Sequence, residues 1–116
     1  MIAFLGVGIP IKRAHIGEAA RLYCGNARTV SRSVDWYYQQ QWDTGRHLMI
    51  SGGYLTNGDL GGRLNISGST LIISNVQKNN SGIYTCVENI GQGKEHPVCL
   101  SVYGELARIY TKLLSG

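Results

Sequence analysis

Three cysteines have the clearest capacity for chemistry in this sequence. Cys24, Cys86 and Cys99 are an odd number, so two of them can form a disulfide and one is left over. Metal sites built on thiolates favour close pairs such as C-x-x-C with histidines nearby. No such pair occurs here, and none of the three histidines belongs to a recognisable motif. The sequence therefore predicts no metal centre and no cofactor.

Catalytic motifs are also missing from the sequence. It contains no G-x-S-x-G, H-E-x-x-H or Walker sequence. Asp35, Asp43 and Asp59 lie near predicted turns, and their spacing does not suggest a pair of carboxylates. We expect a binding module and not an enzyme, although a larger parent protein could carry a catalytic domain such as a kinase.

Two triplets could accept N-linked glycans. They are Asn65-Ile66-Ser67 and the triplet at residues 79–81, which begins with Asn79. We expect both asparagines to lie on the surface. Together with the cysteines, they favour an extracellular location for the protein.

Charge and hydropathy exclude two further classes of partner. The net charge of +4 comes from basic residues scattered along the chain, which is typical of a solvated surface. Nucleic-acid binding would need a denser basic run with interleaved aromatic residues, so we expect no nucleic-acid partner. No apolar run approaches the length of a membrane span.

The cysteines and the candidate glycan sites must be positioned by short segments in which apolar and polar residues alternate. This period-two pattern, interrupted by turn clusters rich in glycine, predicts an all-β sandwich. Residues 52–62 are expected to form loops or a short edge strand. The predicted strands are residues 2–11, 19–24, 34–39, 47–51, 64–67, 70–74, 83–88 and 97–103.

The two ends of the chain are treated separately. We expect one domain over residues 1–103 of a larger, membrane-anchored parent protein. In the tail, residues 104–116, apolar residues recur at helical spacing. The tail is interpreted as a linker, a vector-derived segment or the start of another domain, with a docking helix as the alternative.

The motifs around the cysteines resemble those of the immunoglobulin superfamily across residues 2–103. Residues 36–40, which begin with Trp36, resemble the third-strand motif of that family. Residues 81–86 resemble its sixth-strand motif, and the segment that begins at Leu71 resembles the strand and turn before it. The long stretch after Trp36 is similar to variable-type domains, whereas the segment after Cys86 is similar to intermediate-type domains.

The resemblance implies specific roles for these residues. The fold would be an antiparallel Greek-key β-sandwich of mixed variable and intermediate type. A Cys24–Cys86 disulfide would join the two sheets and pack against Trp36, with Leu71 also in the core. Tyr84 would form the tyrosine corner, because it lies two residues before the second cysteine. One departure is that the family usually pairs an arginine like Arg63 with an aspartate, and Asn80 occupies that position here; asparagine can still accept a hydrogen bond.

Strand alternation also predicts a candidate binding face. If Trp36 and Cys86 point inward, their strand neighbours point outward onto one sheet. The resulting face would be partly apolar. It would comprise Tyr37, Gln39, Leu48, Val87 and Cys99.

Cys99 has several interpretations. An exposed thiol in an oxidising compartment would be expected to pair between chains or to be shielded at an interface. A symmetric homodimer could bring two copies of this residue together. Alternatively, Cys99 is half-buried at a sheet edge, or it pairs with a cysteine in another domain.

The resemblance implies an extracellular recognition or adhesion module of a cell-surface receptor, such as the ectodomain of a receptor tyrosine kinase or an adhesion protein. It would act by protein–protein contact or by self-association. Two alternatives remain open. One is a structural domain of an intracellular muscle-type array, in which the cysteines would be reduced and the glycan sites unused. The other is a soluble immune effector that binds glycans.

Overall fold

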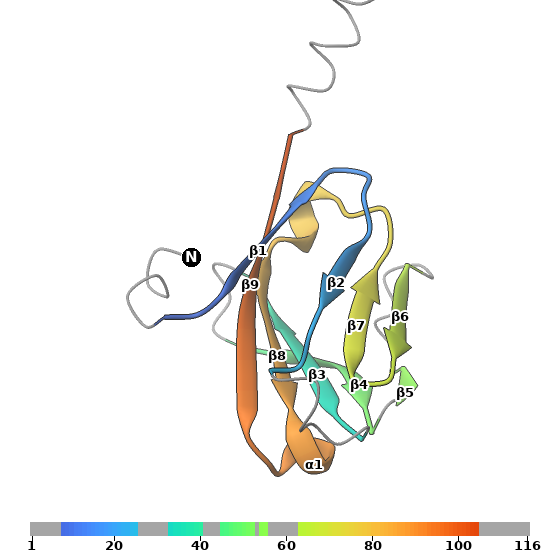
Figure 1. The fold of residues 1–116 in the computed structure, drawn as a ribbon, viewed down its shortest axis with the longest axis vertical. Helices are drawn as coiled ribbons and strands as arrows, with labels where there is room; N and C mark the ends of the chain where they lie inside the picture. The colour runs from blue at the N-terminus through green and yellow to red at the C-terminus, as the bar shows by residue number, and fades with distance from the viewer. Residues whose placement is uncertain (1–7, 26–32, 41–44, 53, 56–62, 105–116) are drawn as a thin grey trace, which may run out of the picture.

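Two packed β-sheets form the fold in a computed structural model that describes residues 8–25, 33–40, 45–52, 54–55 and 63–104 (Figure 1). Residues 2–7 of the predicted first strand and residues 105–116 of the predicted tail lie outside these ranges. The larger sheet has six strands in the order β1-β9-β8-β3-β4-β5, and the smaller has three in the order β2-β7-β6. The strands are β1 (Ile11–His15), β2 (Ala20–Leu22), β3 (Asp35–Gln39), β4 (His47–Ser51), β5 (Tyr54–Leu55), β6 (Leu64–Ser67), β7 (Thr70–Ile73), β8 (Gly82–Val87) and β9 (Glu95–Tyr103).

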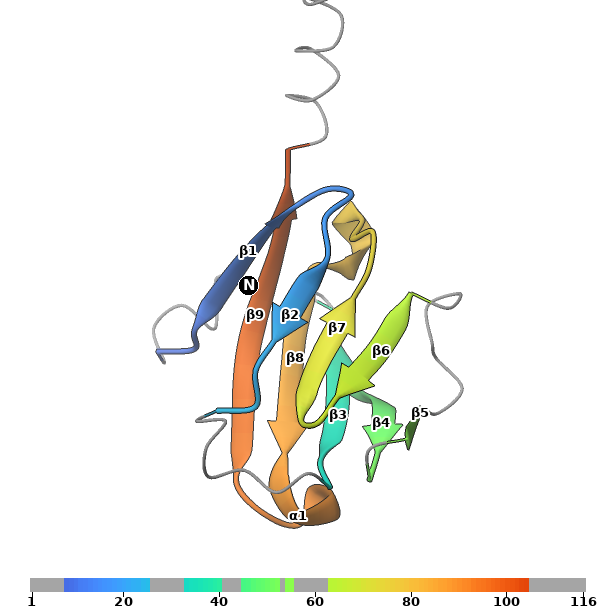
Figure 2. The same ribbon diagram turned by 45° about the vertical axis from the view of Figure 1, so that its right-hand side comes forward.

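The chain passes from one sheet to the other after β1, β2, β5 and β7, and Figure 2 shows the two sheets facing each other. This arrangement confirms the predicted all-β sandwich. The described strand pairs are antiparallel except for β1 and β9, which are parallel. The short strand β5 extends the larger sheet beyond β4, as the additional strands of variable-type domains do.

The first described strand begins later than the sequence predicted. Gly8 has a positive φ of 74°, which turns the chain, and Pro10 has no N–H group to donate to a neighbouring strand. The Pro10 carbonyl accepts a hydrogen bond from the Cys99 N–H at 2.8 Å. Regular pairing with β9 then starts at Ile11. The prediction was wrong at residues 8–10, because an apolar pattern does not show that Gly8 and Pro10 interrupt a strand.

The core lies between the sheets around one disulfide. Cys24 and Cys86 are bonded, with their Cα atoms 5.4 Å apart, and both are fully buried. The Trp36 side chain is also fully buried, and its indole Nε1 donates a hydrogen bond to the Ser69 carbonyl at 3.1 Å. Because β2, β7 and β6 contribute alternate apolar residues such as Leu71, the smaller sheet closes over the indole and the disulfide.

A buried tyrosine ties β8 to the turn that precedes it. The Tyr84 hydroxyl donates a hydrogen bond to the Asn80 carbonyl at 2.6 Å. The centroids of the Tyr84 and Tyr38 rings lie 4.8 Å apart. Burial raises the pKa of Tyr84 far above its ordinary value. The raised pKa favours the protonated hydroxyl, which donates this hydrogen bond.

Arg63 and Asn80 form a hydrogen bond at the position where the family usually has an arginine–aspartate ion pair. The Arg63 Nη1 donates hydrogen bonds to the Asn80 Oδ1 at 3.1 Å and to the Asn75 carbonyl at 2.8 Å. The same Asn80 oxygen accepts a hydrogen bond from the Gln77 N–H at 2.7 Å. Asn80 is the last residue of a short 3-10 helix, Lys78–Asn80. Asparagine thus keeps the geometry of the contact without supplying the negative charge.

We expect Asn80→Asp to raise the free energy of unfolding by about 1 kcal/mol at neutral pH, because a hydrogen bond to a charged acceptor is stronger than a neutral one. The gain should be complete above about pH 4 and should be lost as the pH falls below it, since the paired carboxylate is then protonated. Urea denaturation of unglycosylated protein measures the change. Asn79→Asp, an equal charge change at an exposed neighbour, is the control. A variant no more stable than the parent would contradict the expected gain.

Candidate recognition face

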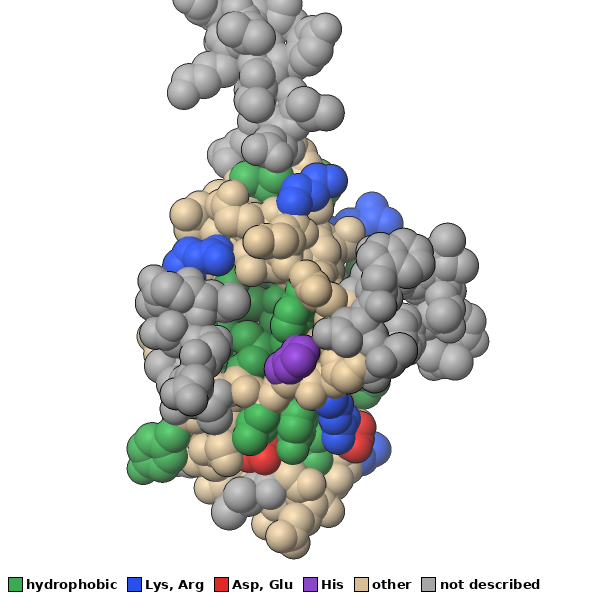
Figure 3. All heavy atoms as spheres, turned by 180° about the vertical axis from the view of Figure 1, so that it is seen from behind, with side chains coloured by type: hydrophobic (Ala, Val, Ile, Leu, Met, Phe, Trp, Pro, Cys, Tyr) green, Lys and Arg blue, Asp and Glu red, His purple; other side chains and the backbone are tan. Residues whose placement is uncertain are grey.

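Three of the residues predicted to form the binding face lie on the outer surface of the six-stranded sheet. Tyr37 on β3 lies opposite Leu48 on β4, and Gln39 lies two residues further along β3 on the same side. Tyr37 and Gln39 are half-buried, whereas Leu48 is 39% exposed. Figure 3 shows hydrophobic side chains gathered over the middle of this face, next to a histidine. The structure therefore brings these three residues together at the surface.

Arg46, which the sequence analysis did not select, crosses this face. Its guanidinium lies 4.3 Å from the centroid of the Tyr37 ring, in a cation–π contact. It also donates hydrogen bonds to the two carboxylate oxygens of Glu95, at 3.0 and 3.4 Å. Because β8 runs between β3 and β9, the Arg46 side chain must pass over β8 to reach Glu95. We call Tyr37, Gln39, Arg46 and Leu48 the recognition face.

The prediction that Val87 is part of an exposed face is wrong. Val87 points away from the main core, as alternation from Cys86 requires, but it is only 2% exposed. It lies on β8 directly between Asp35 on β3 and Glu95 on β9. Val87 therefore has a neighbour on each adjacent strand, and Arg46 reaches the neighbour on β9, Glu95.

Cys99 is likewise buried, at 2% exposure, and the structure contradicts the prediction of an accessible thiol. Its neighbours explain the burial. Cys99 is flanked by Ile83 on β8 and by Ile11 on β1, so β9 is an interior strand and not a sheet edge. A Cys99–Cys99 bond between two copies is therefore incompatible with this structure.

We expect Cys99 to resist alkylation in the native protein. Burial raises the pKa of the Cys99 thiol, so less of the reactive thiolate is present at pH 8 than in an exposed cysteine. Iodoacetamide should label the residue only after unfolding in denaturant without reductant. Mass spectrometry of tryptic peptides measures the label, and native labelling as fast as that of the denatured chain would contradict the burial.

Asp35 is a second residue whose environment the sequence did not predict. Alternation from Trp36 indicated an outward side chain, but Asp35 is buried, and its Oδ1 accepts the Gly52 N–H at 2.8 Å. A Cβ atom placed on Gly91 would lie 2.7 Å from the other carboxylate oxygen. Gly91 ends the short helix α1 (Glu88–Gly91). Asp35 therefore holds the β4–β5 turn and packs against the β8–β9 connection at one end of the sandwich.

The two candidate glycan sites lie in different parts of the domain, one on the smaller sheet and one in the 3-10 helix before β8. Asn65 on β6 and Asn79 in the 3-10 helix are both exposed. The Asn65 Oδ1 accepts the Ile66 N–H at 2.8 Å, and the Asn79 carbonyl accepts the Tyr38 hydroxyl at 3.1 Å. Neither side chain belongs to the recognition face.

Within the described ranges, no three side chains of histidine, cysteine, aspartate or glutamate gather as metal ligands would. In the same part of the chain, no helix has both the length and the apolar character of a membrane span.

A family model described as an immunoglobulin domain matches residues 9–89. The chain therefore belongs to the immunoglobulin domain family, as the motifs around Cys24, Trp36 and Cys86 implied. No curated protein is significantly similar to the chain in sequence.

Three solved structures illustrate the likeness of fold. A novel immune-type receptor 10 extracellular fragment from Ictalurus punctatus is 19% identical, with a TM-score of 0.64 over 80% of this chain and 96% of that one. The ZIG-8 IG1 homodimer is 19% identical, with a TM-score of 0.60 over 82% and 79%. The four N-terminal immunoglobulin domains of Dscam1 isoform 8.4 are 25% identical, with a TM-score of 0.59 over 81% of this chain. This chain spans only 22% of that Dscam1 fragment.

Proposed function

We propose that this domain is an extracellular recognition or adhesion module that acts by protein–protein contact through the recognition face, and not an enzyme. The observation that carries the proposal is the exposed Leu48 beside Tyr37 and Arg46 on one sheet surface. Aromatic residues and arginine are enriched at protein interfaces, and the energy of binding concentrates in a few such residues. The disulfide and the exposed asparagines of the two glycan triplets support an extracellular location.

We include self-association in this proposal. A two-fold symmetric contact needs only one self-complementary face, and sheet-to-sheet packing would place Leu48 of one copy against the partly apolar surface of another. One structure with a similar fold is described as a homodimer, and others come from a cell adhesion molecule and an immune-type receptor. These likenesses support a contact function without specifying a partner.

We expect Leu48→Asp to weaken self-association at least about tenfold, because it would bury an unpaired charge in the contact. Sedimentation equilibrium over a range of protein concentrations measures the dimer constant. Tyr23→Asp is the matched control, since Tyr23 is 57% exposed and follows β2 of the other sheet. A monomer at all concentrations would overturn self-association. A dimer weakened by Tyr23→Asp but not by Leu48→Asp would move the contact away from the recognition face.

A further inference from the structure

A cavity of about 420 Å³ lies at the seam between the two sheets, lined by residues other than the four of the recognition face. Its apolar wall comes from three segments that are distant in the sequence. Figure 2 shows β9 running between β1 and β2, and these three strands or the residues next to them line the cavity. The apolar lining is Pro10 and Ile11 at the start of β1, Leu22 and Tyr23 at the end of β2, and Pro97 and Val98 on β9.

The two strands that flank this cavity are sheet edges. Within the described residues, β1 ends the six-stranded sheet and β2 ends the three-stranded sheet. An edge strand presents a row of backbone N–H and C=O groups that an extended peptide can pair with. Tyr23, just after β2, exposes a large apolar side chain at the opening. The seam therefore offers backbone hydrogen bonds along its sides and apolar contacts in its interior.

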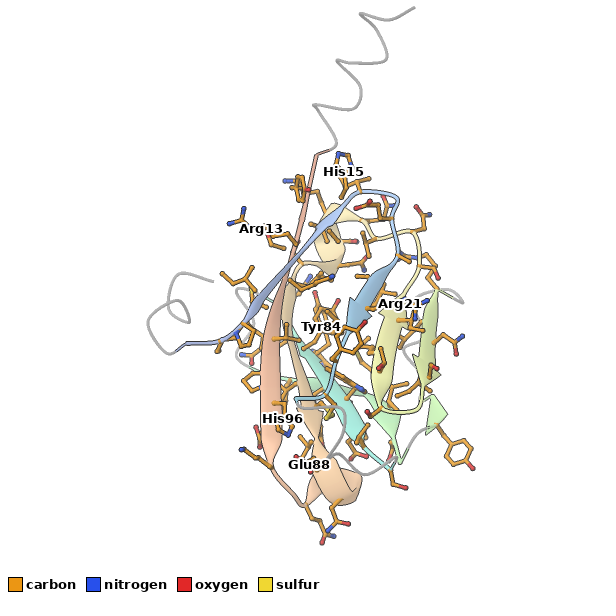
Figure 4. The ribbon with its side chains drawn as sticks, viewed as in Figure 1. Arg13, His15, Arg21, Tyr84, Glu88 and His96 are labelled. Carbon is orange, nitrogen blue, oxygen red and sulfur yellow. A yellow bond between two sulfur atoms is a disulfide. The ribbon has the colours of Figure 1, made fainter. Side chains whose placement is uncertain are left out.

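The charges around the cavity favour an acidic ligand. Glu95 is neutralised by its bidentate contact with Arg46. His96 pairs with Glu88 at the start of α1, and Figure 4 shows these two side chains together at the lower end of the sandwich. The two remaining charged residues of the lining, Lys12 and Arg21, are exposed, and neither forms an ion pair with another described residue.

Strand alternation places the Lys12 side chain on the cavity side of β1. Lys12 lies two residues before Ala14, which is buried in the core, and it pairs with the core residue Leu100. An inward-pointing lysine on an edge strand discourages edge-to-edge pairing with another copy. The same ammonium group would attract a carboxylate in an extended segment laid along the seam.

We propose that this seam binds an extended, acidic peptide segment of a partner protein. One large apolar side chain of the segment would enter the cavity between Tyr23 and Val98, and a flanking acidic side chain would face Lys12. A small cavity with a few polar groups at its rim is the usual form of such a pocket. The site shares no residue with the recognition face, which it borders where Glu95 of the lining pairs with Arg46, and it goes beyond the proposed function.

Amide chemical shifts of isotope-labelled protein, titrated with synthetic tripeptides, test the proposal. The probes are acetyl-Asp-Phe-Asp-amide, its Lys-Phe-Lys counterpart and its Asp-Ala-Asp counterpart. The acidic phenylalanine peptide should shift the amides of Ile11, Tyr23 and Val98 at millimolar concentrations. The other two should bind at least about tenfold more weakly, because each lacks one of the two complementary features.

Two matched pairs of variants locate the site. Lys12→Glu should weaken binding of the acidic peptide about tenfold, whereas Lys78→Glu, an equal charge change in the distant 3-10 helix, should not. Tyr23→Ala should weaken it similarly, whereas Tyr54→Ala, at a more exposed tyrosine on β5, should not.

Several results would overturn the proposal. They are shifts confined to the recognition face, equal binding of the acidic and basic peptides, and an absence of any shift at the cavity. Concentration-dependent shifts at the cavity without peptide would identify a second copy as the occupant. Nuclear Overhauser contacts from Tyr23 to residues 1–7 would identify the chain itself.

Discussion

Replacing Trp36 with alanine should lower the free energy of unfolding by roughly 3–5 kcal/mol. The indole is fully buried in the core cluster that holds the disulfide, and its Nε1 is bonded to the Ser69 carbonyl. The substitution removes apolar contacts, leaves a cavity between the sheets and removes the hydrogen-bond donor of that carbonyl. Equilibrium unfolding in urea, monitored by far-ultraviolet circular dichroism, measures the change.

An exposed aromatic residue provides the control for Trp36. Tyr54 is 78% exposed on β5, so Tyr54→Ala should change the stability by no more than about 0.5 kcal/mol. Small domains are stable by about 5–15 kcal/mol in total, so the Trp36 variant should unfold at a clearly lower urea concentration. An unchanged midpoint for Trp36→Ala would mean that the indole does not support the core.

Removing the Cys24–Cys86 disulfide should destabilise the domain by roughly 2–5 kcal/mol. The bond closes a loop across a sequence separation of 62 residues and joins β8 to the segment that follows β2. Its loss enlarges the conformational freedom of the unfolded chain, and the double variant Cys24→Ala and Cys86→Ala also leaves small cavities in the core. Thermal unfolding should show a melting temperature lower by tens of degrees if each kcal/mol corresponds to about 4–8 °C.

Reduction of the unaltered protein separates the effect of losing the cross-link from the effect of leaving cavities in the core. With excess dithiothreitol the bond is broken but the core atoms remain, so the reduced protein should be less stable than the oxidised protein and more stable than the double variant. Peptide mapping under non-reducing conditions checks the pairing directly. Alkylation of Cys24 or Cys86 in the native, oxidised protein would contradict it.

The residues that point into the core could be predicted because strand geometry is local. Side chains alternate with a period of two, so Leu71 and Ile73 share a face with no information from elsewhere in the chain. Both are fully buried in the structure. The edge strand β5 was predicted only as one of two possibilities, because a two-residue strand is too short to show a period.

The candidate face was predicted less well because strand alternation indicates which way a side chain points, but not whether other residues bury it. Val87 and Asp35 lie on the outward-facing positions of their strands, yet both are buried. Beside Val87, Glu95 on β9 pairs with Arg46 across 49 residues of sequence. No spacing or composition signal connects two residues so far apart, and neither belongs to the motifs that identified the family.

The sequence by itself determined the sandwich, its apolar interior and the family, since periodicity and the motifs around Trp36 are properties of short segments. Only the tertiary structure decided which outward residues reach solvent. The parallel pairing of β1 with β9 converts β9 from a possible edge into an interior strand and buries Cys99 between two isoleucines. Exposure depends on every neighbour in space, and strands distant in the chain supply those neighbours.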